Sequence, residues 1–110
     1  MDFKEYQKEA LKTAKYHNLK IPAIAYCGLK LSGEAGEVSE KIGKVFRDKG
    51  GDFDHSTELE LAKELGDVLW YCAAVADLLG MELEWCAELN IKKLTDREAR
   101  GVIHGSGDNR

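Results

Sequence analysis

The sequence predicts an all-α protein, an antiparallel helical bundle of about four helices that dimer or tetramer assembly completes. Apolar residues recur at intervals of three and four positions over most of the chain, which is the period of an amphipathic helix. Proline occurs once, as Pro22, so most of the chain lacks the strongest helix breaker. Strand patterns are weak throughout, and the breaks between helical segments are short, which favours antiparallel neighbours.

The first two helices are predicted from their caps and apolar spacing. The first is expected over residues 2–17, with Asp2 as its N-cap. Pro22 suits the first turn of a second helix, which runs to about Arg47. Apolar residues spaced by four, three, four and three positions mark the buried face of this helix: Leu31, Ala35, Val38, Ile42 and Val45.

The third helix is expected over residues 57–79, with Ser56 or Thr57 as its cap and Gly80 as its stop. A continuous apolar stripe runs along it: Leu61, Leu65, Val68, Cys72, Val75 and Leu79. The fourth helix is expected over residues 82–100.

The chain is expected to divide into one helical domain and a tail. Residues 1–100 form the single domain, and the glycine-rich residues 101–110 form a flexible C-terminal tail. The alternative for residues 105–110 is a flap that folds over a site and contacts phosphate. The chain has 110 residues, of which 44% are hydrophobic, and this is a thin core for a monomer. A partner subunit would help to bury the remaining apolar faces.

Charge and hydropathy exclude two classes of partner. The net charge is −4, from 16 basic and 20 acidic residues, which argues against binding nucleic acid through its phosphate backbone. The longest apolar run, residues 68–76, is too short to cross a bilayer, and no signal peptide is apparent. We therefore expect a cytoplasmic protein that contacts neither nucleic acid nor membrane. Three cysteines without CxxC spacing are expected as buried thiols: Cys27, Cys72 and Cys86.

Two pairs of acids carry the strongest chemical signal. Glu34 and Glu37 are three residues apart on the second helix, and Glu64 and Asp67 are three apart on the third. Each pair therefore projects from one side of its helix, beside the apolar stripe. If the stripes pack together, four carboxylates meet where water is scarce, and such a cluster needs a cation. Oxygen ligands of this kind suit Mg²⁺, with phosphate oxygens of a substrate completing the coordination.

A solvated helix face is the alternative for any single Glu-x-x-Glu pair, since such pairs are common. Two pairs that each border a core stripe and each have a glycine beside them favour the metal site. The adjacent glycines are Gly33, Gly36 and Gly66. A di-iron centre is disfavoured, because no histidine stands three residues from these acids.

These residues resemble the MazG-like all-α nucleoside triphosphate pyrophosphohydrolase superfamily. The resemblance covers about residues 24–100. It includes Gly-Glu-Ala-Gly-Glu-Val over residues 33–38 and Glu-Leu-Gly-Asp-Val-Leu over residues 64–69. A second segment, Asn90-Ile-Lys-Lys93-Leu-Thr-Asp-Arg97, is similar to the family's Asn-x-x-Lys-(Leu/Phe)-x-x-Arg pattern.

The resemblance implies a reaction and a metal. Water would attack a nucleoside triphosphate between its α- and β-phosphates, giving the monophosphate and pyrophosphate, with Mg²⁺ as cofactor and Mn²⁺ as a substitute. It also implies that the enzyme works as a homodimer or homotetramer. The implied metal ligands and catalytic residues are Glu34, Glu37, Glu64 and Asp67.

The resemblance also implies substrate contacts. Asn90 would bind the base or sugar, and Lys93 and Arg97 would bind phosphate oxygens, although cations near a helix C-terminus are also favourable without a ligand. Some relatives carry a further acid directly before the first glutamate, where this chain has Gly33. Glu40 is the reserve candidate for a general base, and a solvated acid is its alternative interpretation.

The predicted role is the clearing of standard and non-standard (deoxy)nucleoside triphosphates. Two alternatives stay open. One is a base-specific hydrolase that resembles a dUTPase or dCTPase. The other is a helical interaction module without turnover.

Overall fold

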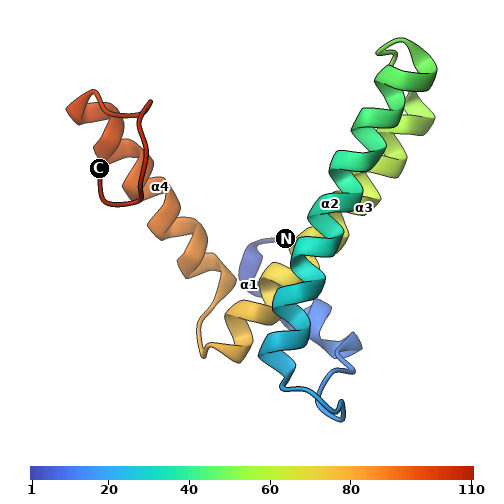
Figure 1. Ribbon diagram of the computed structural model, residues 1–110. Coiled ribbons are helices and arrows are strands. Elements are labelled where there is room, and N and C mark those ends of the chain that lie inside the picture. Colours follow the sequence, from blue (N-terminus) through green and yellow to red (C-terminus); the bar gives the residue numbers. More distant parts are fainter.

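Two long helices form a hairpin that carries most of the fold. In a computed structural model that describes residues 1–110, α2 (Ala23–Lys49) and α3 (His55–Leu78) lie side by side and run antiparallel (Figure 1). Gly50 ends α2 with a φ of 60°, a left-handed conformation that glycine adopts at little cost. The connection over residues 50–54 then leads directly into α3.

The remaining helices join the open end of this hairpin. Helix α1 (Phe3–Ala10) continues as the short 3₁₀ helix η1 (Leu11–Thr13), and α4 (Leu83–Arg100) follows α3. Helices α1 and α4 contact each other, and each also contacts α3. The chain contains no strand. The predicted all-α fold of helices packed against one another is confirmed, whereas assembly into an oligomer stays a prediction.

The predicted first helix is wrong beyond residue 13. Ala14 is extended, with ψ at 126°. The Ala10 carbonyl accepts hydrogen bonds from the Trp70 indole at 3.0 Å and from the Thr13 hydroxyl at 2.8 Å. Tyr16, at 2% exposure, is turned inward onto the hairpin. Contacts with α3, which is distant in sequence, therefore override the local helical pattern.

The caps were predicted correctly at one helix and wrongly at another. The Asp2 carboxylate accepts from the Glu5 amide at 2.8 Å, as expected of an N-cap. Helix α3 begins earlier than predicted because Asp54 caps it, accepting from the Thr57 amide at 2.8 Å. Neither Ser56 nor Thr57 is the cap.

The core is small and lies at the base of the hairpin. Tyr16, Cys27 and Ala74 form its buried centre, with η1, α2 and α3 packed around it. All three cysteines are free thiols, and Cys27 is buried, as predicted. Cys72 and Cys86 are only half-buried, because the helix faces that carry them are not fully covered.

Helix α4 leaves this core as a separate arm (Figure 1). The junction is held by Gln7, whose side-chain amide donates to the carbonyls of Ala73 at 3.1 Å and Met81 at 3.3 Å. The same side chain accepts from the Leu83 amide at 3.1 Å, the first residue of α4. The radius of gyration is 16.7 Å, against about 13 Å for a compact chain of this length.

The divergent arms leave apolar surface uncovered. Only 10 of 110 residues are buried, and large apolar side chains are exposed on every helix. No helix combines the length and the apolar character that a membrane span requires.

Candidate metal centre and the α4 arm

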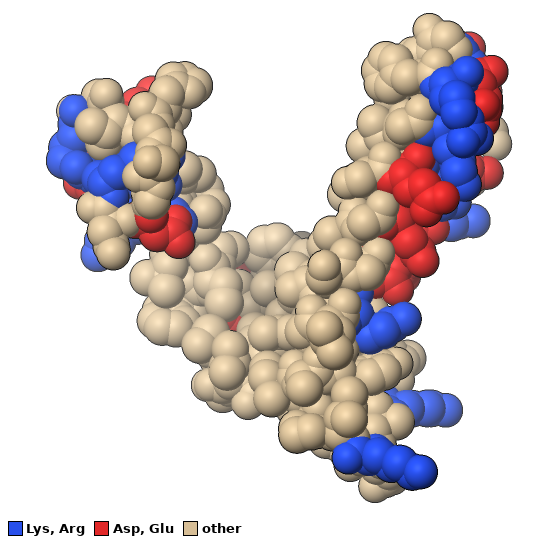
Figure 2. Space-filling view, viewed as in Figure 1, with Lys and Arg blue, Asp and Glu red and all other residues tan.

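Three carboxylates converge between α2 and α3. Glu34 and Glu37 project from one face of α2, and Glu64 projects toward them from α3. One oxygen from each of the three lies within 4.8 Å of the others. Figure 2 shows acidic side chains gathered on this hairpin arm. The three-residue spacing places the pair on α2 together, and the antiparallel hairpin brings the third acid opposite.

The protein balances only part of the negative charge in this cluster. A hydrogen bond with Glu64 raises the pKa of Glu37, and the negative charges of Glu34 and Glu64 raise it further. Glu64 Oε2 is buried and has no hydrogen-bond partner. The one cation near Glu64 is Lys41, whose Nζ lies 3.5 Å from the other oxygen, Oε1.

The donor set fits a hard divalent cation. A buried, unpartnered carboxylate oxygen beside two further carboxylates is an arrangement that a positive ion stabilises. Mg²⁺ takes oxygen ligands and keeps coordination positions for water or phosphate. These three glutamates are therefore the residues of this chain best placed to hold the metal.

The Asp67 carboxylate does not lie with the three converging carboxylates. It lies one turn beyond Glu64 on α3, its side chain is exposed, and it is absent from the group of oxygens within 4.8 Å. Its charge acts on α1 instead: burial raises the pKa of Tyr6, and the nearby Asp67 carboxylate raises it further. The structure thus brings together three of the four acids that the sequence singled out.

Glu40 is drawn away from the cluster. Its carboxylate lies 3.0 Å from Lys44 Nζ, and this hydrogen bond and charge lower its pKa. A carboxylate with a lowered pKa is a weaker base, so this pairing disfavours Glu40 as the acceptor of a proton.

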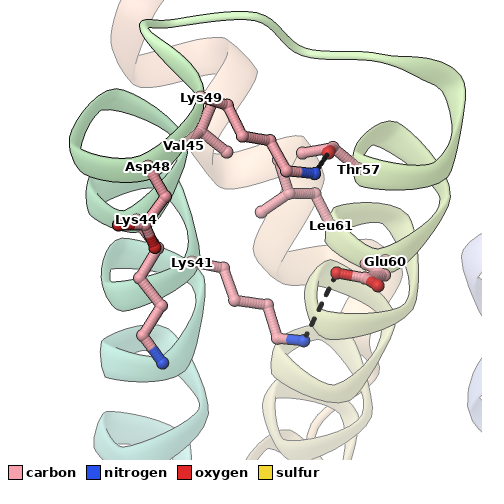
Figure 3. Close-up of a pocket in the computed structure, with 8 residues that line it drawn as sticks. All are labelled: Lys41, Lys44, Val45, Asp48, Lys49, Thr57, Glu60 and Leu61. Atoms are coloured by element: carbon pink, nitrogen blue, oxygen red, sulfur yellow. Dashed lines mark hydrogen bonds and ion pairs between the residues drawn. The ribbon is translucent and has the colours of Figure 1, made fainter.

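A basic cavity adjoins the acids toward the tip of the hairpin. It has a volume of about 280 Å³ and is lined mainly by polar side chains of α2 and α3, including Lys41, Lys44 and Lys49 (Figure 3). Lys41 connects the two regions, because its Nζ lies 3.9 Å from Glu60 in the cavity and 3.5 Å from Glu64 in the cluster. Sequence reasoning missed Lys41, although its position one turn after Glu37 is the signal that would have found it.

The predicted substrate-binding residues lie on the other arm. Asn90, Lys93 and Arg97 belong to α4, which diverges from the hairpin (Figure 1). Asn90 is exposed. Lys93 and Arg97 contact the C-terminal segment: Lys93 Nζ lies 3.0 Å from Asp108 Oδ1, and Arg97 donates to the Asp108 carbonyl at 2.7 Å. Sequence reasoning did not identify Asp108, because only the folded-back chain brings it to these cations.

Fold and site together define an all-α protein with a cluster of three carboxylates on a helical hairpin. The profile of the MazG nucleotide pyrophosphohydrolase domain matches residues 26–102, and the chain belongs to this family. The chain is 42% identical, over 109 residues, to the "Gene 37 protein" of Mycobacterium phage L5, with 96% of each protein covered. No solved structure matches. The resemblance predicted from the acid pairs and the α4 segment is confirmed.

Proposed function

We propose that this protein is a Mg²⁺-dependent nucleoside triphosphate pyrophosphohydrolase, which converts (deoxy)nucleoside triphosphates to monophosphates and pyrophosphate. The observation that carries the proposal is the convergence of Glu34, Glu37 and Glu64, with a buried unpartnered oxygen, in a chain of the MazG family. Clearing of the nucleotide pool is the role we assign to it, in the cytoplasm, where its substrates are made.

The acids of the hairpin would hold the metal. Glu34, Glu37 and Glu64 form the core of the site, and Asp67 joins as a fourth ligand by reorienting its exposed side chain. Bound Mg²⁺, or Mn²⁺ in its place, would neutralise phosphate charge and lower the pKa of the attacking water. A carboxylate not engaged by the metal takes the proton of that water.

The basic residues would orient the triphosphate. Arg97 offers a planar guanidinium that binds phosphate oxygens in pairs, and Lys93 adds a point charge on the same face of α4. Asn90 would contact the base or sugar. Because α4 diverges from the acids of its own chain, we propose that a homodimer or homotetramer brings α4 and the metal centre together.

The exposed apolar side chains support this assembly. They are too numerous for isolated surface residues, and they lie on both arms. On the hairpin the set includes Leu29, Phe46 and Leu65, and on α4 it includes Trp85, Leu89 and Ile91.

A substrate panel with product analysis tests the proposal. The chain is incubated with each standard dNTP and NTP, and with dUTP, in Mg²⁺ or in EDTA, and the products are separated by ³¹P NMR. We expect equal amounts of monophosphate and pyrophosphate in Mg²⁺, and no turnover in EDTA. Release of orthophosphate would contradict the assigned bond cleavage.

The same panel separates the alternatives. Comparable rates across bases support clearing of the pool, and turnover of a single substrate supports a base-specific hydrolase. Absence of turnover on every substrate, with the helical circular dichroism spectrum intact, supports the non-catalytic interaction module.

A further inference from the structure

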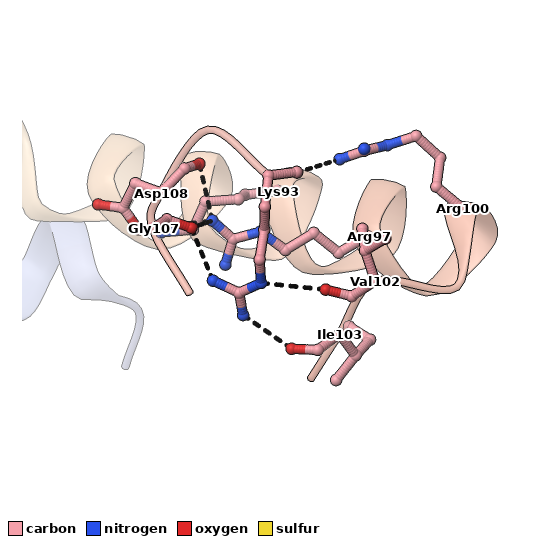
Figure 4. A network of polar contacts seen from close by, with 8 residues as sticks. Lys93, Arg97, Arg100, Val102, Ile103, Gly107 and Asp108 are labelled. Atoms are coloured by element: carbon pink, nitrogen blue, oxygen red, sulfur yellow. Dashed lines mark hydrogen bonds and ion pairs between the residues drawn. The ribbon is translucent and has the colours of Figure 1, made fainter. Parts of the chain in front are cut away.

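The C-terminal segment folds back onto α4 through a network of basic side chains (Figure 4). Arg97 Nη2 donates to the carbonyls of Gly107 at 3.2 Å and Asp108 at 2.7 Å, and it lies 3.5 Å from Asp108 Oδ1. Lys93 Nζ donates to the same carboxylate at 3.0 Å. Arg100 reaches the carbonyl of Arg110. The segment therefore contacts three successive turns of the helix.

The segment is also held together from within. The Arg110 side chain donates to the carbonyls of Val102 at 3.0 Å, Ile103 at 2.7 Å and Gly107 at 2.7 Å. Backbone conformation favours glycine at one position of this loop, and the Arg110 side chain crowds a second. Gly107 has a φ of 84°, and a Cβ at Gly105 would lie 2.7 Å from Arg110 Cδ. These contacts and the glycine conformation stabilise the return of residues 101–110 along α4.

As a result, Arg97 is buried, but not all of its hydrogen-bond donors have a partner. Its residue exposure is 4%, and a buried guanidinium stays charged and needs partners. Every hydrogen bond it makes leaves from Nη2, and the buried Nε has no partner. The unpaired Nε is enclosed, so a phosphate reaches Arg97 only where the segment shifts, whereas the Lys93 side chain is 37% exposed and open to a ligand.

The charge balance of the network also leaves it positive. Four basic side chains take part, Lys93, Arg97, Arg100 and Arg110, against the two carboxylates of Asp96 and Asp108. A segment that mimicked a phosphate and blocked the cations would neutralise them and use up their donors. The segment holds Arg97 by two main-chain carbonyls and a longer contact to the Asp108 carboxylate, and it leaves an excess of basic side chains, as expected of a brace.

We infer that residues 101–110 form a brace that orders Lys93 and Arg97 for the phosphates of the substrate, with Asp108 as the positioning residue. This inference rests on the proposed function, because that function supplies a polyphosphate as the ligand. Ordering the two long side chains before binding removes the entropic penalty of fixing them at the moment of binding.

The test compares Asp108→Asn with Asp96→Asn in the full-length chain. Both variants remove one carboxylate from the same network, but Asp96 pairs only with Arg100, at 2.8 Å. Binding of inorganic pyrophosphate in the presence of Mg²⁺ is measured by calorimetry. We expect Asp108→Asn to weaken binding about tenfold, and Asp96→Asn to stay within about twofold of the unchanged chain. KM for the triphosphate should rise in parallel while kcat changes little.

Hydrogen exchange gives a second readout that needs no turnover. Pyrophosphate should slow exchange of the amides of residues 101–110, because a brace closes on its ligand. Asp108→Asn should speed their exchange in the free protein. Faster exchange with pyrophosphate, or tighter binding by Asp108→Asn, would overturn the inference and identify the segment as a block. Absence of pyrophosphate binding by the unchanged chain would overturn it as well.

A second variant covers the case in which Asp108→Asn perturbs the segment itself. Asp108 is 83% exposed at its side chain, so the helical core does not depend on it. Arg110→Lys keeps the charge but loses the fork that spans three carbonyls, and it should weaken pyrophosphate binding in the same direction. If the chain binds pyrophosphate but hydrolyses no triphosphate, the proposed function fails, and the binding and exchange measurements still decide the role of the brace.

Discussion

At the scale of single residues, Glu37 is where like charges oppose folding most directly. Its pKa lies above the ordinary value of 4.5 because it shares a hydrogen bond with Glu64 and feels the charge of Glu34. A carboxyl group with a raised pKa in the folded state binds its proton more tightly there than in the unfolded chain. This group therefore favours folding at low pH, and its contribution is lost as pH rises from about 4.5 through the raised pKa.

We predict that Glu37→Gln stabilises the metal-free protein at pH 7. The neutral amide removes repulsion that is fully present above the raised pKa of Glu37. In EDTA, the midpoint of thermal unfolding followed by circular dichroism should rise by a few degrees. Glu60→Gln, one turn from Glu64 and outside the cluster, is the control and should show no such gain. A lower midpoint for Glu37→Gln in EDTA would show that the cluster is not self-repelling.

The same residue should be indispensable for turnover. We predict that Glu37→Gln and Asp67→Asn each lower the rate of triphosphate hydrolysis by about 100-fold or more, with unchanged helical content by circular dichroism. Near-full activity in both variants would remove the acid pairs from the catalytic site. Loss of activity in Glu37→Gln alone would exclude Asp67, consistent with its position outside the converging oxygens.

At the scale of elements, local pattern predicted the long helices but not their junction. The apolar spacing and the flanking breaks placed α2 and α4 within about two residues of their observed ends, although much of the apolar surface of both helices is exposed in one chain. Residues 14–17 follow the same pattern, yet Trp70 and the core remove them from the helix. The i, i+3 spacing singled out four acids, of which Glu34, Glu37 and Glu64 converge and Asp67 does not. The direction of α4 escaped prediction because hydrogen bonds distant in sequence set it.

We predict that Gln7→Ala loosens this junction. Gln7 is buried and bonds two carbonyls and the first amide of α4, so its loss leaves buried polar groups unpaired. The free energy of unfolding in urea should fall by about 1–3 kcal/mol. Lys8→Ala, at the exposed neighbouring position, should change it by less than about 0.5 kcal/mol. A Gln7→Ala variant as stable as the Lys8→Ala variant would show that the junction does not depend on these bonds.

At the scale of the whole molecule, one chain is an open shape with too little core. Its extents are 44 × 43 × 29 Å, and its two arms diverge from a core of a few buried residues. Small domains reach stability by burying more apolar surface, and a second copy offers that surface here. The same step would bring the cations Lys93 and Arg97 of α4 to an acidic hairpin, which is the reason the assembly matters for function.

We predict an oligomer in solution, with α4 in its interface. Light scattering after size exclusion should give at least twice the 12.3 kDa mass of one chain. Ile91→Glu places a charge on an exposed apolar position of α4 and should shift the mass toward the monomer. Lys92→Glu, on the adjacent exposed position, is the matched control and should leave the mass unchanged. A monomeric unchanged chain would contradict the proposed assembly.

We propose that Glu34, Glu37 and Glu64 together hold a divalent cation between α2 and α3. Titration with Mn²⁺, followed by electron paramagnetic resonance of the free ion, measures this directly and needs no substrate. We expect saturable binding in the unchanged chain and in Glu60→Gln, and affinity weakened about tenfold or more in Glu37→Gln and Glu64→Gln. Equal Mn²⁺ affinity in all four proteins would contradict it.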